Sequence, residues 1–368
     1  MDLSSIFTSK ATQLFWERLE DSQIAEARTS QVIENGEAYF VIRLKEMYVG
    51  FGRKLWRKYY PMLHGFTKHG QSEEHTVAGP GQLHELGEAN LDRIVNLNQR
   101  LAGPTPFNGD DVALLVGLYA IPGEDAAKAL IGTVATLANL GGITVGQAIP
   151  IAAAVKSGIE SILGLNDAQL QLGIRDSFYA GNVLRTGFYV GIGADRGAVN
   201  SRELWLRNGR LVKGRDPNVG RPYQDHDYMV LEIERRDTRD DWPSLPGMAD
   251  FQERSSKIMA DAALRAPDKK KRLGELWPFF QTILSNSPYL TQPDRARIAL
   301  NVSQDLQRRL IAQKTGNPFE TKSLTGDGAG IIPSNHFDLL EVLDYFEVDS
   351  DATRRRAVTA LNGDPFSG

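Results

Sequence analysis

Cysteine is absent from this chain of 368 residues. Without it the protein has no disulfide framework, no thiol nucleophile and no cysteine-containing zinc or iron–sulfur site. An excess of one charge is also missing, because 42 Lys and Arg stand against 46 Asp and Glu, a formal net charge of -4. This balance argues against a globally basic nucleic-acid coat, so we expect no nucleic-acid partner. The first ten residues lack the basic and apolar pattern of a secretory signal, which together with the missing cysteines favours a cytoplasmic protein.

Sequence motifs of several large enzyme classes are missing too. The chain has no G-x-x-x-x-G-K-[ST] phosphate loop, no G-x-S-x-G nucleophile elbow and no H-E-x-x-H zinc motif. A glycine-rich segment, Gly191-Ile-Gly193-Ala-Asp-Arg-Gly197, follows a strand-like run. Its last glycine is one position too far along for a dinucleotide-binding turn, and a hairpin follows where a crossover helix would be needed. We therefore expect a loop between strands there and no cofactor.

One long apolar run is present. Residues 129–155 contain no charged side chain, and the run is long enough to cross a bilayer. The pair Gly141-Gly142 in its middle favours two short helices over one long helix. We expect an apolar helical hairpin at about 124–164, buried as an insertion in the neighbouring domain. A segment that meets a membrane in some triggered state is the alternative.

The hairpin is flanked by segments rich in β-branched and aromatic residues. Strands are expected at Glu37–Val49, Val112–Ala120, Val183–Ile192 and Tyr228–Glu234, whereas residues 50–110 are broken by turn residues. In Glu203–Lys213, Leu204 and Leu206 precede Asn208-Gly209, the pattern of a type I′ hairpin. Short strands joined by hairpins favour an antiparallel β-sandwich over residues 31–241.

Helical patterns lie at both ends of the chain. Apolar residues recur at helical spacing over residues 3–29, which predicts an N-terminal amphipathic helix within 1–30. Residues 242–368 are expected to form an all-α module, with a flexible linker at about 315–333. Its helices are expected at 248–266, 269–285, 293–314, 336–346 and 352–361. Pro278 should kink or split the second of these. The fold class is thus α+β, a sandwich followed by a helical module.

Histidines gather in one window and raise the possibility of a zinc site. They are His64, His69, His75 and His84, with Glu73, Glu74 and Glu85 near them. Imidazole and carboxylate ligands bind zinc without cysteine, but this spacing matches no standard zinc motif. The other interpretation is that they are surface histidines in a polar, turn-rich region. A metal-dependent hydrolase is one function that the zinc interpretation allows.

A second candidate metal site lies before the strand at 228–234. Asp225 and Asp227 alternate along an extended chain and so share a face, and Asp216 lies in the preceding loop. Their oxygens suit Ca²⁺. A D-x-D before a strand resembles the acidic loop of calcium-dependent C2 domains, and that resemblance implies a C2-like sandwich that binds membranes. The alternative is a solvated acidic turn paired with Arg215 or Arg221.

A basic and aromatic patch is the candidate for partner binding. Its residues are Arg53, Trp56, Arg57, Tyr59 and Tyr60. Guanidinium groups interleaved with aromatic rings suit a protein or an anionic ligand. The leading hypothesis is a non-enzymatic interaction, scaffold or adaptor protein that binds another protein or itself. The alternative is a membrane-acting effector whose 124–164 segment is released by a trigger such as proteolysis.

Overall fold

The computed structural model describes residues 14–26, 29–50, 53–54, 57–70, 72–78, 93–122, 169–178 and 183–315. It is an α+β protein in which antiparallel sheets are followed by helices. The chain divides into a sheet unit, Met1–Asn35 and Tyr39–Arg235, and a helical unit, Gly36–Ala38 and Arg236–Gly368. The boundary expected at 241 and 242 falls just inside the helical unit. The expected hairpin at 124–164 and the helices at 336–346 and 352–361 lie outside the described residues.

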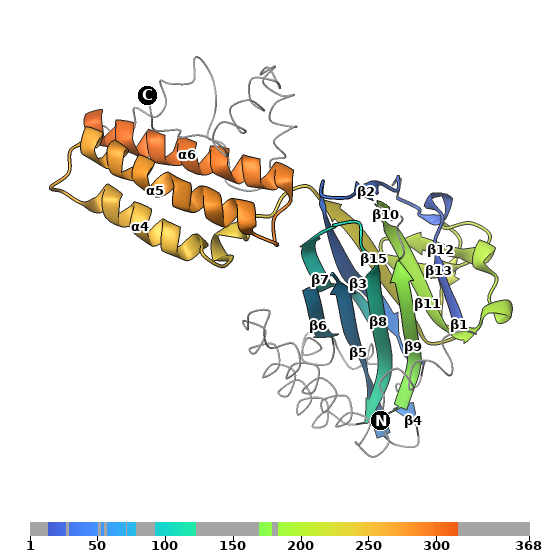
Figure 1. Cartoon of the computed structure of the whole chain (residues 1–368). Helices are drawn as coiled ribbons and strands as arrows, with labels where there is room; N and C mark the ends of the chain where they lie inside the picture. The colour runs from blue at the N-terminus through green and yellow to red at the C-terminus, as the bar shows by residue number, and fades with distance from the viewer. Residues whose placement is uncertain are drawn as a thin grey trace. The chain divides into compact units, whose positions relative to one another are not determined.

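Two five-stranded sheets make up most of the sheet unit (Figure 1). The first has the order β1-β11-β15-β3-β7, and the second has β4-β5-β8-β9 with β6 paired to β5. Strands of the first sheet are β1 (Leu14–Arg18), β11 (Gly187–Asp195), β15 (Tyr228–Arg236), β3 (Tyr39–Tyr48) and β7 (Arg93–Pro106). Strands of the second are β4 (Arg53–Lys54), β5 (Arg57–His69), β6 (Ser72–Ala78), β8 (Val112–Pro122) and β9 (Gln169–Phe178). The strands expected around β3, β8, β11 and β15 are thereby confirmed.

Smaller β elements complete the unit. β2 (Val32–Glu34) pairs with β10 (Val183–Arg185), and β12 (Leu204–Arg207), β13 (Arg210–Lys213) and β14 (Arg221–Pro222) form a three-stranded sheet. The turn between β12 and β13 has φ 52° at Asn208 and φ 70° at Gly209. Positive φ at both central residues is the requirement of a type I′ turn, so the predicted hairpin is confirmed.

Side chains of the two large sheets contact each other. Trp16 on β1 donates its indole N–H to the Asp176 carboxylate on β9 at 2.6 Å. Phe40 on β3 meets the ring of His69 on β5 edge to face, with 5.2 Å between ring centroids. These contacts join residues far apart in sequence, so the sheets fix each other's position.

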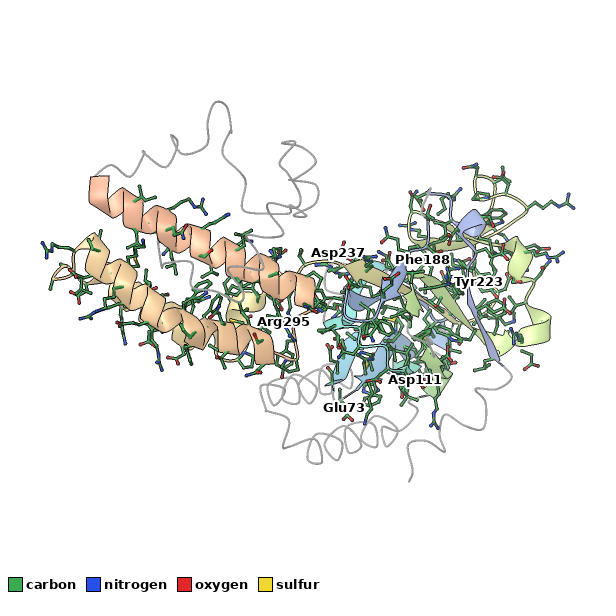
Figure 2. The ribbon with its side chains drawn as sticks, turned by 45° about the horizontal axis from the view of Figure 1, so that its top comes forward. Glu73, Asp111, Phe188, Tyr223, Asp237 and Arg295 are labelled. Atoms are coloured by element: carbon green, nitrogen blue, oxygen red, sulfur yellow. The ribbon has the colours of Figure 1, made fainter. Side chains whose placement is uncertain are left out.

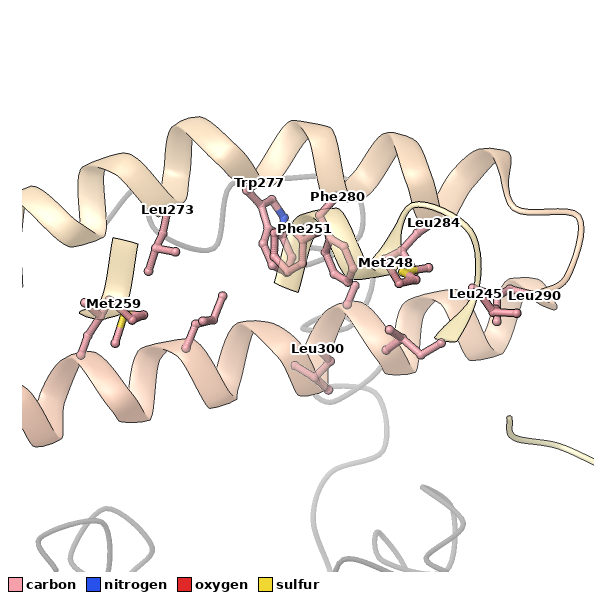
Figure 3. Packing of buried hydrophobic residues seen from close by; sticks show 14 residues of the cluster. Leu245, Met248, Phe251, Met259, Leu273, Trp277, Phe280, Leu284, Leu290 and Leu300 are labelled. Carbon is pink, nitrogen blue, oxygen red and sulfur yellow. The ribbon is translucent and has the colours of Figure 1, made fainter. Parts of the chain in front are cut away.

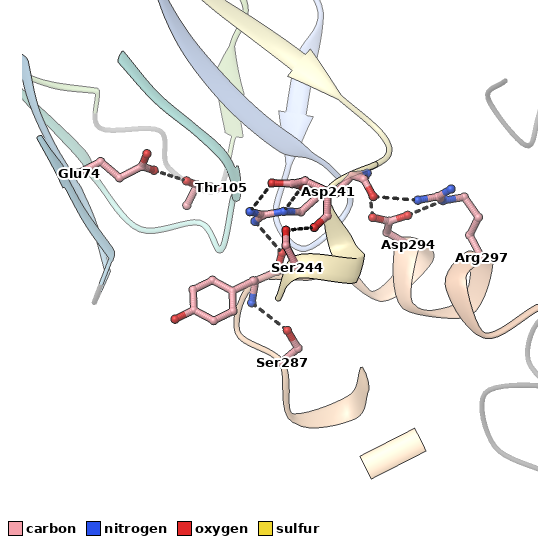
Figure 4. Close-up of polar contacts among 9 residues, drawn as sticks. Glu74, Thr105, Asp241, Ser244, Ser287, Asp294 and Arg297 are labelled. Atoms are coloured by element: carbon pink, nitrogen blue, oxygen red, sulfur yellow. Dashed lines mark hydrogen bonds and ion pairs between the residues drawn. The ribbon is translucent and has the colours of Figure 1, made fainter. Parts of the chain in front are cut away.

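Glu74 joins β6 to β7 in the same unit. Its carboxylate accepts hydrogen bonds from the Gly103 backbone N–H at 2.9 and 3.1 Å. It also accepts from the Thr105 hydroxyl at 2.9 Å (Figure 4). A carboxylate that holds two donors from one strand fixes that strand beside its own. Glu74 is therefore a structural residue of the sheet unit.

Two expectations for the sheet unit were wrong. The amphipathic helix expected over residues 3–29 does not form at 14–18, because these residues form β1, in which Phe15 pairs with Ile192 and Arg18 with Tyr189. Tertiary pairing overrides the helical spacing of a segment rich in aromatic residues. Residues 50–110, expected to be turn-rich, contain β5 and β7, which are 13 and 14 residues long.

The helical unit is built from α4 (Met248–Ala260), α5 (Ala266–Asn286) and α6 (Gln292–Thr315). Their positions confirm three of the expected helices. α5 is continuous through Pro278, so the expected splitting at this residue was wrong. Pro278 is exposed, and the buried side chains of Leu273, Trp277 and Phe280 on either side hold the helix in place.

An aromatic cluster forms the centre of the helical unit (Figure 3). Phe251 of α4 and Phe280 of α5 stack with their ring centroids 4.1 Å apart, and Trp277 lies 5.1 Å from Phe280. Each ring is at most 2% exposed. Burying aromatic rings of this size stabilises a small helical unit by several kcal/mol, about 1.5–3 for each large apolar side chain.

Two buried charged residues complete the packing of the helical unit. Lys269 of α5 donates its ammonium to the Met259 carbonyl at 2.6 Å, which satisfies an orphan carbonyl at the end of α4. Asp294, in the first turn of α6, accepts from the Arg239 backbone N–H at 3.0 Å and pairs with Arg297 (Figure 4). Asp294 thus fixes the chain that leads into the unit to the start of α6.

The apolar segment at 124–164 is not part of the described structure. In the part of the chain that is described, no helix combines the length and the apolar character needed to cross a membrane. The linker expected at about 315–333 also lies beyond the last described residue, Thr315.

Candidate interaction groove

The helical unit has a groove between α4 and α6. α5 packs against both of these helices and lies between them (Figure 1). The groove has a volume of ≈ 520 Å³. Ligand-binding clefts have volumes of about 300–1,000 Å³. It is lined along α4 by Phe251 and Ser256 and along α6 by Asn301 to Arg309, so its walls are two helices held by a third.

The floor of the groove is apolar and continuous with the core. Phe251 and Leu306 are 2% and 5% exposed and belong to the buried cluster, whereas Trp242 and Val302 are partly exposed and pack against it. Since the floor residues are anchored by packing, the groove exists before anything binds. Little ordering is needed on association, and this preserves binding free energy.

The rim of the groove is polar and carries positive charge. Ser256, Asn301, Arg308 and Arg309 are exposed. Arg309 pairs with Asp305 at 2.7 Å, with the two side chains 59% and 42% exposed. An ion pair this exposed contributes little to stability, so its guanidinium can turn to another carboxylate at small cost. The lining contains two arginines and one aspartate, so its net positive charge favours an acidic ligand.

The three acidic residues proposed for calcium binding each interact with different groups of the protein. The Asp225 carboxylate pairs with Lys213 at 2.9 Å and with Arg221 at 2.6 Å, and the hydrogen bond from Lys213 lowers its pKa. Asp227 accepts from the Gly50 backbone N–H at 2.7 Å, and burial raises its pKa. Asp216 accepts from the backbone N–H of Asn218 at 2.6 Å.

The three acidic residues expected to bind calcium therefore interact with other groups of the protein in this structure. Within the described ranges, no three His, Asp or Glu side chains lie close enough together to hold a metal ion. Calcium at Asp216, Asp225 and Asp227 and zinc at the histidines remain predictions from the sequence.

Beside this loop, Tyr223 and His226 form a second polar pair. The Tyr223 hydroxyl and His226 Nδ1 are 2.9 Å apart, and burial raises the pKa of Tyr223 to about 12. Tyr223 belongs to the same buried cluster as Phe188 of β11, and both are labelled within the sheet unit in Figure 2. Tyr223 is buried and His226 is exposed, so the pair joins the acidic loop to the buried cluster.

The basic and aromatic patch is described only in part. Arg53 and Arg57 lie on β4 and β5, and the backbone pairs Arg53 with Lys58. Trp56 lies outside the described residues, and Tyr60 is placed on β5. The Tyr59 side chain is 8% exposed. Partner binding by this patch stays a prediction from the sequence.

His64 and His69 are not surface residues, so that interpretation of the histidine window was wrong for both. Both lie on β5 and are 5% and 4% exposed. His69 Nε2 accepts from the Asn108 backbone N–H at 3.1 Å, and its ring stacks on Phe107 with centroids 5.6 Å apart. This histidine fixes the turn between β7 and β8. His75 lies on β6, and His84 lies outside the described residues.

The glycine-rich segment at 191–197 begins inside β11, so the expected loop was wrong for Gly191 and Gly193. A Cβ atom at Gly191 would lie 2.2 Å from the Cδ1 of Ile174 on β9. Glycine at this position lets the second sheet approach the first closely. The motif is explained by packing between strands.

Sequence reasoning did not identify the groove. Val302 and Leu306 were part of an expected helix, and their spacing of four residues indicates only that one face is apolar. The one signal was Arg308-Arg309, which follows that apolar pair directly. Comparison of the chain with protein-family models, curated proteins and solved structures gave no match.

Proposed function

We propose that this is an interaction protein whose helical unit binds an amphipathic helix of a partner protein in the groove between α4 and α6. The observation that carries the proposal is the preformed apolar floor with an arginine-bearing rim. A helix laid into such a groove presents apolar side chains at positions i, i+3, i+4 and i+7, a common mode of peptide recognition. With α4, α5 and α6 it would complete a four-helix arrangement.

The groove's size fits a few anchoring side chains. Each Leu or Phe that leaves water for the floor contributes about 1.5–3 kcal/mol. Two or three such anchors, less the cost of association, correspond to micromolar binding, about -8 kcal/mol. Trp242 also lines the groove. Tryptophan is one of the residue types enriched among those that contribute most binding energy at interfaces.

In this proposal the sheet unit is the scaffold. We propose that its two large sheets form a β-sandwich, supported by the contacts of Trp16 with Asp176 and Phe40 with His69. A C2-like topology stays a prediction. A cytoplasmic location is part of the same proposal and rests on the cysteine-free sequence.

The test is groove-dependent cross-linking. Because the chain has no cysteine, Ser256→Cys introduces a single thiol on the groove rim that can carry a photoreactive group. The labelled full-length chain is irradiated in an extract of its host, and the attached peptide is sequenced by mass spectrometry. We expect one partner segment with acidic residues and apolar residues at helical spacing.

Charge-reversal variants decide whether the groove is responsible. Arg308→Glu with Arg309→Glu reverses the rim and should reduce cross-linking at least tenfold. The matched control is Lys271→Glu with Arg272→Glu, an exposed basic pair on α5 that does not line the groove. Equal yields from the two double variants would overturn the proposal.

The other functions considered from the sequence have no support from the described residues. The membrane-acting alternative rests on residues 124–164 and is tested by leakage of liposomes with intact and proteolysed protein. The metal-dependent hydrolase is tested by elemental analysis of the purified protein. Both remain predictions.

A further inference from the structure

We propose that residues 336–346 of the same chain occupy the groove between α4 and α6 in competition with the partner. This inference rests on the proposed function and adds its regulation: the chain holds its own binding site closed until a partner displaces the segment. The occupant is a named part of the protein, chosen by its pattern, its charge and its distance along the chain.

The pattern of the segment matches what the groove accepts. Leu339, Val342, Leu343 and Phe346 stand at positions i, i+3, i+4 and i+7. In a helix these four side chains form one apolar stripe, while Asp338, Glu341 and Asp344 fall on the other side. The groove offers the complementary surface, an apolar floor of Phe251, Val302 and Leu306 beneath a polar rim.

The charges are complementary as well. Residues 336–351 contain acidic side chains and no Lys or Arg. The rim carries Arg308 and Arg309, of which the second shares its guanidinium with the exposed Asp305. An acidic helix would offer these arginines carboxylates at the edge of an apolar contact, where water is partly excluded and the pairing is stronger than on an open surface.

The connection between α6 and residues 336–346 is long enough for this segment to reach the groove. α6 ends at Thr315, and residues 316–335 separate it from His336. Extended, this connection spans roughly 65 Å. The groove residues on α6 begin at Asn301, and a helix rises 1.5 Å per residue, so the return path along α6 is only about 20 Å. A tether of this length gives an effective concentration of about a millimolar, enough to fill a groove of micromolar affinity.

Disulfide trapping in the full-length chain tests the proposal. One variant carries Asn301→Cys on the groove rim and Val342→Cys on the apolar stripe. The control carries Lys271→Cys on α5, outside the groove, and the same Val342→Cys. Because no native cysteine competes, oxidised glutathione can convert the two introduced thiols of each variant into one intramolecular disulfide, with release of reduced glutathione. The rate is followed at low protein concentration by non-reducing electrophoresis and peptide mass spectrometry.

We expect the groove pair to close at least ten times faster than the control pair, and to slow when Arg308→Glu and Arg309→Glu are added. Equal rates for the two pairs would overturn the proposal. Bonds that join two chains would also overturn it, because the groove would then be filled by a second copy. Asn301 and Lys271 are both exposed, and the two variants share Val342→Cys, so loss of folding does not imitate a difference between them.

A second readout separates this inference from the proposed function. Leu343→Glu in the full-length chain puts a charge in the middle of the stripe and should raise groove-dependent cross-linking to the partner several-fold. If trapping fails while the partner is still captured through the groove, only the inference is wrong. If the segment does not react with the cysteine of Asn301→Cys and no partner reacts with the labelled cysteine of Ser256→Cys, the proposed function fails as well.

Discussion

The interior of the sheet unit and the interior of the helical unit are stabilised by different kinds of contact. In the sheet unit, polar side chains such as the partly buried Glu74 and the buried His69 join segments that are 29 and 39 positions apart in sequence. In the helical unit, stacked rings of Phe251 and Phe280 join helices that follow one another directly. The difference means that each unit should be weakened by a different class of substitution.

The largest effect is expected at the aromatic centre of the helical unit. Phe280→Ala removes a fully buried ring that touches Phe251 and Trp277, and should lower the free energy of unfolding of this unit by about 3–5 kcal/mol. Urea denaturation followed by circular dichroism at 222 nm measures the loss.

Phe279→Ala is the matched control for this prediction. Its ring is only partly buried and lies 4.8 Å from the Arg254 guanidinium, so its removal should cost about 1 kcal/mol. Equal losses from the two neighbouring substitutions would show that ring stacking does not hold the unit together.

The next effect separates two adjacent glutamates of the sheet unit. Glu74→Ala leaves the Gly103 N–H and the Thr105 hydroxyl without their acceptor and should cost about 2–3 kcal/mol. Glu73→Ala removes only an ion pair to the half-exposed Lys68 and should cost less than about 1 kcal/mol. Thermal melting of both variants makes the comparison, and a larger loss from Glu73→Ala would refute the role given to Glu74.

A smaller effect is expected where the two sheets approach each other. Gly191→Ala places a methyl group against Ile174 and should cost about 1–2 kcal/mol. Gly193→Ala meets its nearest atoms at 3.5 Å, an ordinary contact, and should be nearly neutral. Ile174→Val removes the crowded Cδ1 atom, so the double variant with Gly191→Ala should recover part of the loss. Additive losses in this cycle would contradict steric crowding as the cause.

The smallest effect concerns pH. Burial raises the pKa of Asp227 in the folded protein above 3.8, its ordinary value. Between pH 3.8 and the folded-state pKa, the folded state therefore binds more protons than the unfolded state. Stability therefore falls as pH rises from about 4 through the folded pKa. Asp227→Asn keeps an acceptor for the Gly50 N–H and does not titrate. Its stability relative to the parent chain should increase across this window, and a pH-independent difference would contradict the assignment.

The helical unit could largely be predicted from the sequence, and the sheet unit only in part. α4, α5 and α6 follow from apolar spacing and from Pro293 near the start of α6, which are local signals. β1 could not be predicted, because it is a strand only by pairing with β11, which lies more than 170 positions further along the chain. β7 likewise depends on pairing with β3, more than 40 positions earlier in the chain.

The groove could not be predicted for a related reason. Its lining comes from α4 and α6, and their separation is set by how both helices pack on α5. Periodicity reports which face of a helix is apolar but not how far that face lies from another helix. Val302 and Leu306 therefore had the pattern of ordinary core residues, and only the structure shows that Val302 is partly exposed in a groove.

A binding titration tests the central claim, that the α4–α6 groove takes an acidic amphipathic helix, most directly. A fluorescent synthetic peptide of residues 336–351 is added to the full-length Leu343→Glu chain, and its anisotropy is measured. The account predicts saturable binding in the micromolar range, at least tenfold weaker when Arg308→Glu and Arg309→Glu are added and unchanged with Lys271→Glu and Arg272→Glu. The account is contradicted if the peptide does not bind, or if it binds equally well to the chain with the reversed rim.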